Sequence, residues 1–254
     1  MYEGENMNKF YQKNELGFAI FWIVLYVVGA SVADMLSELI GINKIITFIY
    51  LLALSIVLLI WIFKNNLKDK YGLCKPTHNS KQFLYYIPLV VLISVNLWCG
   101  VSLNVSITEM IFYILTMFCV GFVEEIIFRG LLFRAMEKDN IKTAIIVSSL
   151  TFGIGHIINL FVGSDMSLIA NICQICYAIA IGFLFVIMFY RGKSLIACIV
   201  THSIFNALSV FQNASSGLVD ILISLILIIV PTIYAVILLK TLPLDNNNTQ
   251  KSDN

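Results

Sequence analysis

Long apolar runs, each close to the length of a membrane-spanning helix, dominate the chain. A helix needs about 20 mostly apolar residues to cross a bilayer core. The runs lack the alternation of apolar and polar positions that marks the strands of a membrane barrel. Eight runs meet the length criterion: 16–35, 44–63, 83–103, 107–136, 143–161, 167–190, 194–211 and 218–239. We therefore predict an all-α, polytopic integral membrane protein with about eight transmembrane helices.

Composition supports this class and excludes others. Hydrophobic residues make up 59% of the 254 residues and charged residues only 12%, whereas soluble domains carry roughly 25% charged residues. A soluble enzyme could not bury so much apolar surface. Neither a disordered chain nor a nucleic-acid-binding protein combines so many hydrophobic residues with so few charged ones. The expected surroundings are the lipid bilayer, and nucleic acid is excluded as a partner.

The basic residues indicate the orientation. With the N-terminus in the cytoplasm, Lys44 is alone on the outer side, and Arg129 lies within a span. Every other Lys or Arg falls in the two tails or in the three loops on the cytoplasmic side. Because cytoplasmic loops are enriched in Lys and Arg, we predict that both termini are cytoplasmic. We expect an N-tail over 1–15, a single membrane domain over 16–240 and a disordered polar tail over 241–254.

Polar side chains gather in three of the predicted spans. The fourth holds Glu124, Glu125 and Arg129, the fifth His156, and the seventh His202 and Asn206. At ~1.5 Å per helical residue they lie roughly 12 to 20 Å from the cytoplasmic ends of their spans. They can therefore share one layer of the membrane. Buried ionisable groups are costly there and usually functional.

The spacing of these residues indicates their pairing. Glu125 and Arg129 are four residues apart, so they share a helix face and can form an ion pair. Glu124 points about 100° away around the helix and is left as the unpaired carboxylate, which suits a general base. His202 and Asn206 are also four residues apart, as are Phe152 and His156, so each pair lines one face.

Three kinds of chemistry suit this set. Glu124 and His156 could hold and deprotonate a water, while His202 and Asn206 donate hydrogen bonds to a tetrahedral oxyanion. Alternatively, Glu124, His156 and His202 could bind zinc or another divalent metal. The third interpretation is that the residues form hydrogen bonds between helices and carry no chemistry.

Three motifs resemble those of a known family. Residues 124–129 read E-E-x-x-x-R, residues 152–156 read F-x-x-x-H, and residues 202–206 read H-x-x-x-N. In this order, on separate membrane helices, they resemble the CPBP family, also called the type II CAAX prenyl endopeptidase or Abi family of intramembrane proteases. The resemblance runs from about residue 121 to 206, within an expected catalytic core over 107–211.

The resemblance implies peptide-bond hydrolysis in a site open toward the cytoplasm and the bilayer. Glu124 carries over as the base, His156 as its water-holding partner, and His202 and Asn206 as the oxyanion pair. Glu125, Arg129 and Phe152 carry over as supporting residues. The family is often described as metalloproteases, so the resemblance implies either a zinc-type cofactor or none.

Biological expectations follow from the same resemblance. The chain is rich in Ile, Asn and Lys, as in low-GC bacteria, so we expect a bacterial cytoplasmic membrane and a substrate other than a prenylated protein. Bacterial relatives are associated with peptide or bacteriocin processing and with self-immunity. We therefore predict an endopeptidase acting on a membrane-associated peptide or protein. The alternatives are a non-proteolytic immunity or scaffold protein and a proton- or cation-coupled transporter.

Overall fold

The computed structural model describes residues 2–161, 167–213 and 217–243, and within these it contains helices but no strand. The α-helices are α1 (Tyr2–Lys13), α2 (Glu15–Ile40), α3 (Ile45–Lys64), α4 (Ile87–Ser94), α5 (Ile107–Glu124), α6 (Arg134–Met136), α7 (Ile141–Gly155), α8 (Leu168–Gly192), α9 (Ile196–Leu208) and α10 (Gly217–Thr241). A π-helical segment, η3 (Glu125–Phe133), joins α5 to α6. Short 3₁₀ turns are η1 (Leu84–Tyr86), η2 (Val95–Leu97), η4 (His156–Leu160) and η5 (Ser209–Phe211).

All eight predicted spans are helical, but they differ in length. Among the described residues, six helical stretches are long and apolar enough to cross a membrane. The other two, Leu84–Leu97 and Ile196–Phe211, are shorter apolar helices. At ~1.5 Å per residue they extend only about 21 and 24 Å. The third predicted span was too long, because the helix ends at Leu97 and Gly100, with a φ of +91°, turns the chain before the apolar run is complete. The protein is thus an integral membrane protein with a polytopic helical fold.

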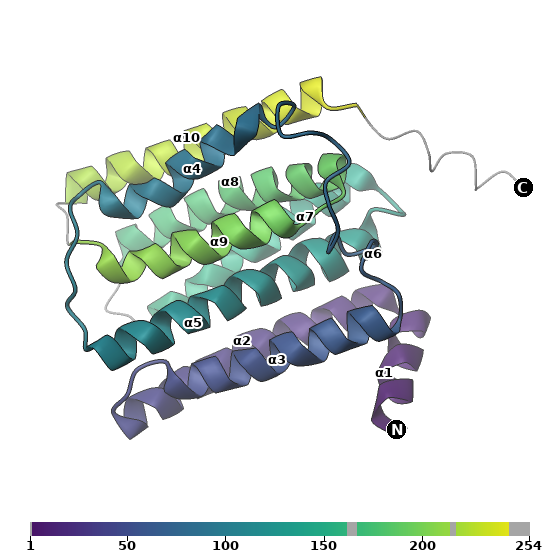
Figure 1. The fold of residues 1–254 in the computed structure, drawn as a ribbon, viewed down its shortest axis with the longest axis horizontal. Coiled ribbons are helices and arrows are strands. Elements are labelled where there is room, and N and C mark those ends of the chain that lie inside the picture. The colour runs from purple at the N-terminus through teal and green to yellow at the C-terminus, as the bar shows by residue number, and fades with distance from the viewer. Residues whose placement is uncertain (1, 162–166, 214–216, 244–254) are drawn as a thin grey trace, which may run out of the picture.

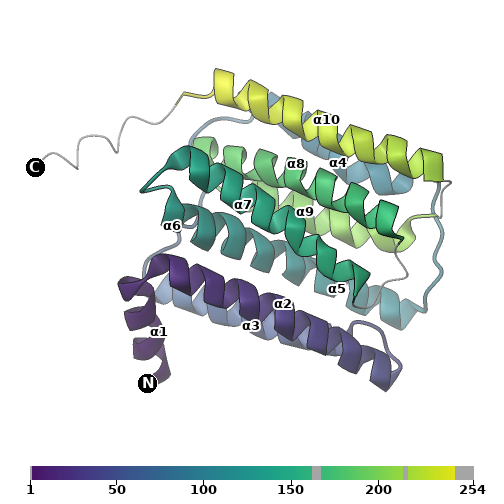
Figure 2. The same ribbon diagram turned by 180° about the vertical axis from the view of Figure 1, so that it is seen from behind.

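The helices lie roughly side by side in one bundle (Figures 1 and 2). The bundle runs from α2 and α3 on one side, through α5, α7, α8 and α9, to α4 and α10 on the other. Within it α8 packs against α7 and α10, and α5 packs against α9 and α3. Large apolar side chains remain exposed on the outer helices, such as Val28 at 57% and Ile233 at 56%, as expected for faces that meet lipid.

Both ends of the described chain lie at the same end of the bundle, together with the loops that carry most of the Lys and Arg residues (Figure 1). This agrees with the predicted even number of spans. The N-terminal segment that we predicted as a tail is a helix, α1, whose Tyr11 is buried against the rings of Phe18 and Trp61. The predicted tail beyond residue 243 lies outside the described residues.

One long helical stretch, Ile107–Met136, passes through the centre of the bundle. Its middle, η3, is π-helical, and all nine residues of η3 are buried. A π-segment breaks the regular i to i−4 bonding and is frequent at functional sites. Ser148 of α7 donates a hydrogen bond of 2.9 Å to the carbonyl of Phe128 within this segment. The glutamates lie where α5 changes into this wider helix.

Candidate active site

The helices α5 and α9 approach closely just before the two glutamates. A Cβ atom added at Gly121 would lie 2.7 Å from the backbone nitrogen of Ser203, closer than real Cβ contacts allow. A glycine is therefore required for this approach. Because His202 precedes Ser203, the contact brings the histidine of α9 against Glu124 and Glu125.

Glu125, Arg129 and His202 form a buried charged network. Arg129 Nη1 donates to Glu125 Oε1 at 3.1 Å, and both side chains are 0% exposed. His202 Nδ1 lies 2.8 Å from the same carboxylate oxygen. The ion pair predicted from the four-residue spacing is confirmed. A buried charge is tolerated when it is paired, so this network neutralises Arg129 and fixes one edge of the His202 ring.

Glu124 has different partners. Tyr26 of α2 donates a hydrogen bond of 2.5 Å to Glu124 Oε1, and His202 Nε2 lies 3.4 Å from Glu124 Oε2. Within the described part of the chain no Lys or Arg pairs with this carboxylate. The prediction of a carboxylate without a cationic Lys or Arg partner is therefore confirmed, and Tyr26 and His202 are partners that the sequence did not predict.

The sequence analysis missed Tyr26, because a tyrosine in an apolar run counts as hydrophobic. Its hydroxyl group was a usable signal in the sequence, since a buried tyrosine hydroxyl usually has a hydrogen-bond partner. Tyr26 lies eleven residues into α2 (Glu15–Ile40), near the middle of a span. A hydroxyl at that depth has no water on the lipid side and indicates a polar partner inside the bundle.

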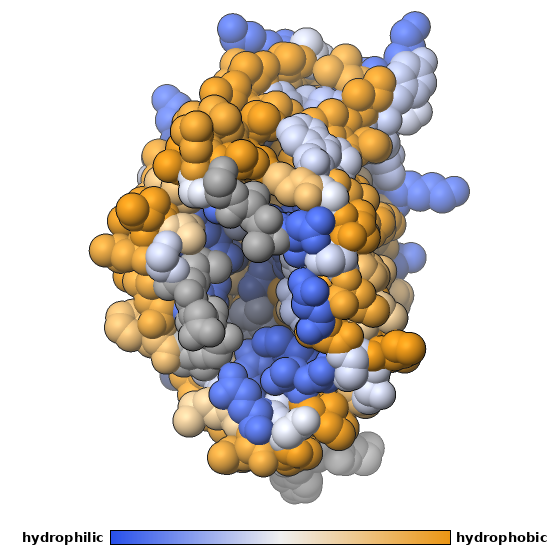
Figure 3. Space-filling view, turned by 90° about the vertical axis from the view of Figure 1, so that its left-hand side faces the viewer, coloured by the Kyte–Doolittle hydropathy of each residue, from blue (hydrophilic) through white to orange (hydrophobic). Residues whose placement is uncertain are grey.

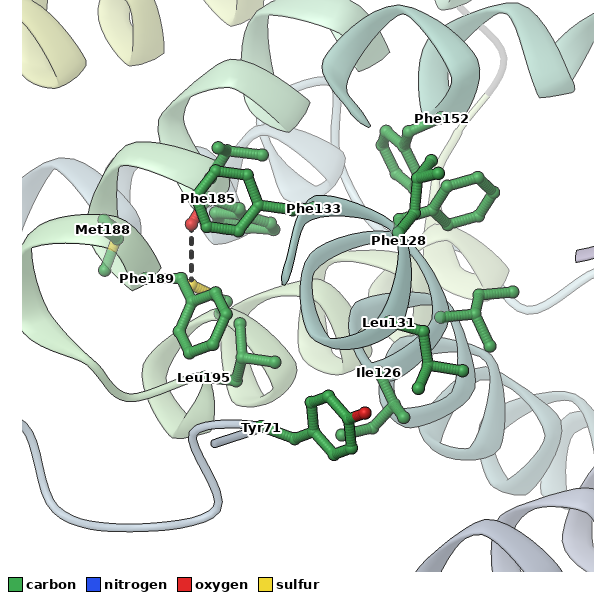
Figure 4. Packing of buried hydrophobic residues seen from close by; sticks show 14 of the residues in the cluster. Tyr71, Ile126, Phe128, Leu131, Phe133, Phe152, Phe185, Met188, Phe189 and Leu195 are labelled. Carbon is green, nitrogen blue, oxygen red and sulfur yellow. Dashed lines mark hydrogen bonds between the residues drawn. The ribbon is translucent and has the colours of Figure 1, made fainter. Parts of the chain in front are cut away.

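Phe152 lies at the centre of the site and separates its polar groups. Its ring is 4.0 Å from the guanidinium carbon of Arg129 and makes edge contacts with His156 at 5.3 Å and His202 at 5.6 Å between centroids. Figure 4 shows Phe152 beside Phe128, at the edge of the buried apolar cluster. The supporting role predicted for Phe152 thus has a geometric basis in these contacts.

His156 presents one ring nitrogen to the protein and the ring edge to a cavity. It lies at the C-terminal end of α7, where Asn171 of α8 donates to its carbonyl at 2.9 Å. Its Nδ1 lies 3.2 Å from the carbonyl oxygen of Phe152. Because a carbonyl only accepts, Nδ1 is the donor, and in the neutral ring Nε2 then carries a free lone pair.

Asn206 lies one helical turn after His202 on α9. Its side chain faces the same cavity as His156, and its carboxamide makes no hydrogen bond to any other described residue. Asn96 of η2 donates at 2.6 Å to the carbonyl of the preceding residue, Phe205. This bond fixes the backbone just before Asn206, while the side-chain donors of Asn206 stay available to a ligand.

A cavity of about 520 Å³ joins these groups. Glu124, His156 and Asn206 line its inner part, together with Tyr26 and Phe152. A second pocket of about 30 Å³ is lined by His156, His202 and Asn206 and is otherwise mostly apolar. Ligand pockets span about 300–1,000 Å³, so the larger cavity can hold a small piece of a peptide.

The donor set does not fit a metal ion. Among the described residues, no three His, Cys, Asp or Glu side chains are arranged to hold one. Both nitrogens of His202 already face carboxylates, and a histidine needs a free lone pair to ligate a metal. The metal site proposed from Glu124, His156 and His202 is therefore not assembled in this structure.

Comparison with known proteins gives one match. Residues 105–208 match the family model described as type II CAAX prenyl endopeptidase Rce1-like. The match includes all three motifs, from Glu124 to Asn206, and confirms the resemblance. No curated protein and no solved structure matches the chain. Over these residues the chain is similar to CAAX-protease-like membrane endopeptidases.

Proposed function

We propose that this protein hydrolyses a peptide bond in a membrane-associated peptide or protein, with Glu124 as the general base. One observation carries the proposal: Glu124, His156 and Asn206, from three separate helices, face a single cavity, while Glu125 and Arg129 are sealed beneath them at 0% exposure. A set of interhelical hydrogen bonds would need no such cavity. The family match supports the same reaction class.

The proposed reaction begins with a water between Glu124 and His156. The lone pair of His156 Nε2 accepts a hydrogen bond from this water, and Glu124 Oε2 takes its proton as the oxygen attacks the peptide carbonyl. Tyr26 donates to Glu124 Oε1 at 2.5 Å, whereas His202 Nε2 lies 3.4 Å from Oε2, so Oε2 is the less tightly held oxygen and takes the proton. The proton then passes from Glu124 to the departing amine nitrogen, giving a carboxyl and an amine product.

Asn206 suits the developing oxyanion. Its carboxamide donors are free of other described residues, and one donor of this kind is worth roughly 10²–10³ in kcat. We assign His202 a positioning role in place of the oxyanion role expected from the sequence. Its two ring nitrogens face Glu124 and Glu125, so the ring orients the base.

A paired processing assay tests the proposal. Wild type and Glu124→Ala, at equal expression in membranes, are given a panel of small membrane-associated peptides, and the products are read by mass spectrometry. Loss of the base should lower cleavage at least ~10²-fold. Glu38→Gln is the matched control, because Glu38 is an exposed carboxylate outside the cavity. Equal processing by wild type and Glu124→Ala would refute the proposal.

The biological role that we propose is peptide maturation or bacteriocin self-immunity in a bacterial cytoplasmic membrane. The paired assay also separates this from binding-based immunity. A protective phenotype that survives in Glu124→Ala would show that binding alone protects, whereas loss of protection together with cleavage would support the proteolytic role.

A further inference from the structure

The cavity extends toward only one end of the bundle. From Tyr26 and Glu124 it continues along α2 to Asp34, and its lining there includes Lys44, Tyr113 and Gln212. Asp34 lies eight residues after Tyr26 on the same helix, about 12 Å farther along the axis. Figure 3 looks onto this end of the molecule and shows a hollow in which hydrophilic side chains gather.

This end of the bundle has a polar lining that suits water and peptide. Lys44 Nζ lies 2.9 Å from Asp34 Oδ1, and both side chains are about one quarter exposed. Tyr113 and Ser209 share a hydrogen bond of 2.7 Å. Both of these pairs line the cavity, so their groups can exchange bonds with an entering peptide backbone.

The other end of the bundle is closed by apolar packing. Phe133, Phe189 and Leu195 are 0% exposed there, and Tyr71 is 1% exposed. Figure 4 shows these side chains gathered around the helix that carries the glutamates. Neither of the two described pockets includes any of these four residues, so their packing lies between the cavity and this end.

A loop over this closed end holds the packing in place. The carbonyl of Gly72 accepts from the backbone nitrogen of Leu195 at 2.8 Å. Arg134 Nε donates to the carbonyl of Lys70 at 3.0 Å, and Ser194 Oγ donates to the carbonyl of Cys74 at 2.6 Å. These three bonds to loop carbonyls fix the loop against α6 and the turn between α8 and α9, so opening this end would break several bonds at once.

Charge assigns the two ends to the two sides of the membrane. The closed end carries the loops around Lys68, Lys138 and Lys193, whereas Lys44 is the one Lys or Arg at the hollow end within the described residues. Basic loops face the cytoplasm. The hollow end therefore faces away from the cytoplasm, opposite to the opening that the family resemblance implies.

We infer that the substrate reaches Glu124 from the non-cytoplasmic side, as an extended peptide segment at the outer face of the membrane. That the entering peptide is a substrate rests on the proposed function. The direction of entry rests only on the cavity, the apolar packing at the closed end and the distribution of charges. The corresponding partner is a peptide that has been translocated or that projects outward, and a cytoplasmic C-terminal tail is excluded.

The size of the cavity favours an extended conformation. A helix ~10 Å across occupies roughly 420 Å³ per turn, so 520 Å³ holds little more than one turn. An extended chain covers the ~12 Å between Asp34 and Tyr26 with about four residues, at ~3.3 Å each. A scissile bond at Glu124 therefore needs an unwound segment of at least this length.

Accessibility of substituted cysteines tests the direction of entry. Ser31 lines the cavity and Ser80 is exposed on the loop at the closed end, so Ser31→Cys and Ser80→Cys form a matched pair. Sealed right-side-out vesicles receive a small, charged, membrane-impermeant thiol reagent before or after permeabilisation. Peptide-level mass spectrometry then separates label at the new position from label at the six native cysteines.

We expect Ser31→Cys to be labelled in sealed vesicles, and Ser80→Cys to be labelled only after permeabilisation. Labelling of Ser31→Cys only after permeabilisation, or not at all, overturns the inference, as does labelling of Ser80→Cys in sealed vesicles. If Ser31→Cys does not fold, Gln212→Cys at the mouth serves in its place. A Glu124→Gln background should keep the same labelling while cleaving nothing, so failure of the entry route and failure of the proposed reaction are distinguishable.

Discussion

Replacing Glu125 with glutamine isolates the charge of the buried network from its shape. Gln is nearly isosteric and keeps an oxygen that accepts from His202 Nδ1, now 2.8 Å away, and from Arg129 Nη1, now 3.1 Å away. What the substitution removes is the negative charge that neutralises Arg129, whose side chain is 0% exposed. The guanidinium would then be a buried cation without a carboxylate partner among the described residues, packed against the Phe152 ring.

The expected cost is large compared with the stability of a typical protein. Removing one member of a buried ion pair costs about 3–5 kcal/mol, whereas proteins unfold with only about 5–15 kcal/mol. At ~1.4 kcal/mol per factor of ten, the lower bound corresponds to a change of roughly 150-fold in the unfolding equilibrium. Lys138→Gln is the control: Lys138 is 56% exposed and pairs with Glu15, and exposed pairs contribute about 0–1 kcal/mol.

Unfolding of the purified protein in detergent micelles, followed by loss of helical circular dichroism against temperature, measures the difference. Glu125→Gln should unfold well below wild type, and Lys138→Gln should stay close to it. Equal midpoints for Glu125→Gln and wild type would refute the view that this ion pair neutralises a buried charge. A large shift in Lys138→Gln would show that the assay reports on something other than burial.

Four further outcomes are expected. Tyr26→Phe removes a hydrogen bond to a carboxylate, worth about 1.5–3 kcal/mol, so kcat should fall roughly 10- to 150-fold with KM unchanged; a change in KM alone would contradict the positioning role. Asn206→Ala should lower kcat roughly 10²–10³-fold, and a value near wild type would remove it from the oxyanion site. Gly121→Ala should push α5 from α9, lowering the free energy of unfolding by about 1–3 kcal/mol and abolishing cleavage; a stable, active variant would contradict the close approach. Chelators in the assay should leave the rate unchanged, because the described donors do not assemble a metal site around His202, and inhibition reversed by added metal would contradict this.

The fold was largely predictable because lipid restricts the chain to few solutions. Apolar runs near 20 residues must form helices to satisfy their backbone, and each predicted run is helical in the structure. The ends of the membrane-spanning helices were less predictable. The third span ends early, at Leu97, and the positive φ of Gly100 leaves the apolar residues after it outside a helix. Hydropathy alone cannot detect this, since Val101 and Leu103 score as membrane residues.

The site was predictable where the chemistry depends on spacing along one helix. The Glu125–Arg129 pair follows from four-residue spacing and is present. Contacts between helices were not predictable in the same way. Tyr26 meets Glu124 only because α2 packs against the η3 region, and the bridging position of His202 depends on the close approach at Gly121. The side to which the cavity opens likewise depends on packing between distant loops.

The most direct test of the central claim is the cleavage rate of purified Glu124→Gln relative to wild type on the peptide identified by the processing assay. Glu124→Gln keeps the acceptor for Tyr26 and removes the base, so the account predicts a rate at least ~10²-fold lower, with unchanged unfolding and with Glu38→Gln at the wild-type rate. Cleavage by Glu124→Gln within a few-fold of wild type would contradict Glu124 as the base.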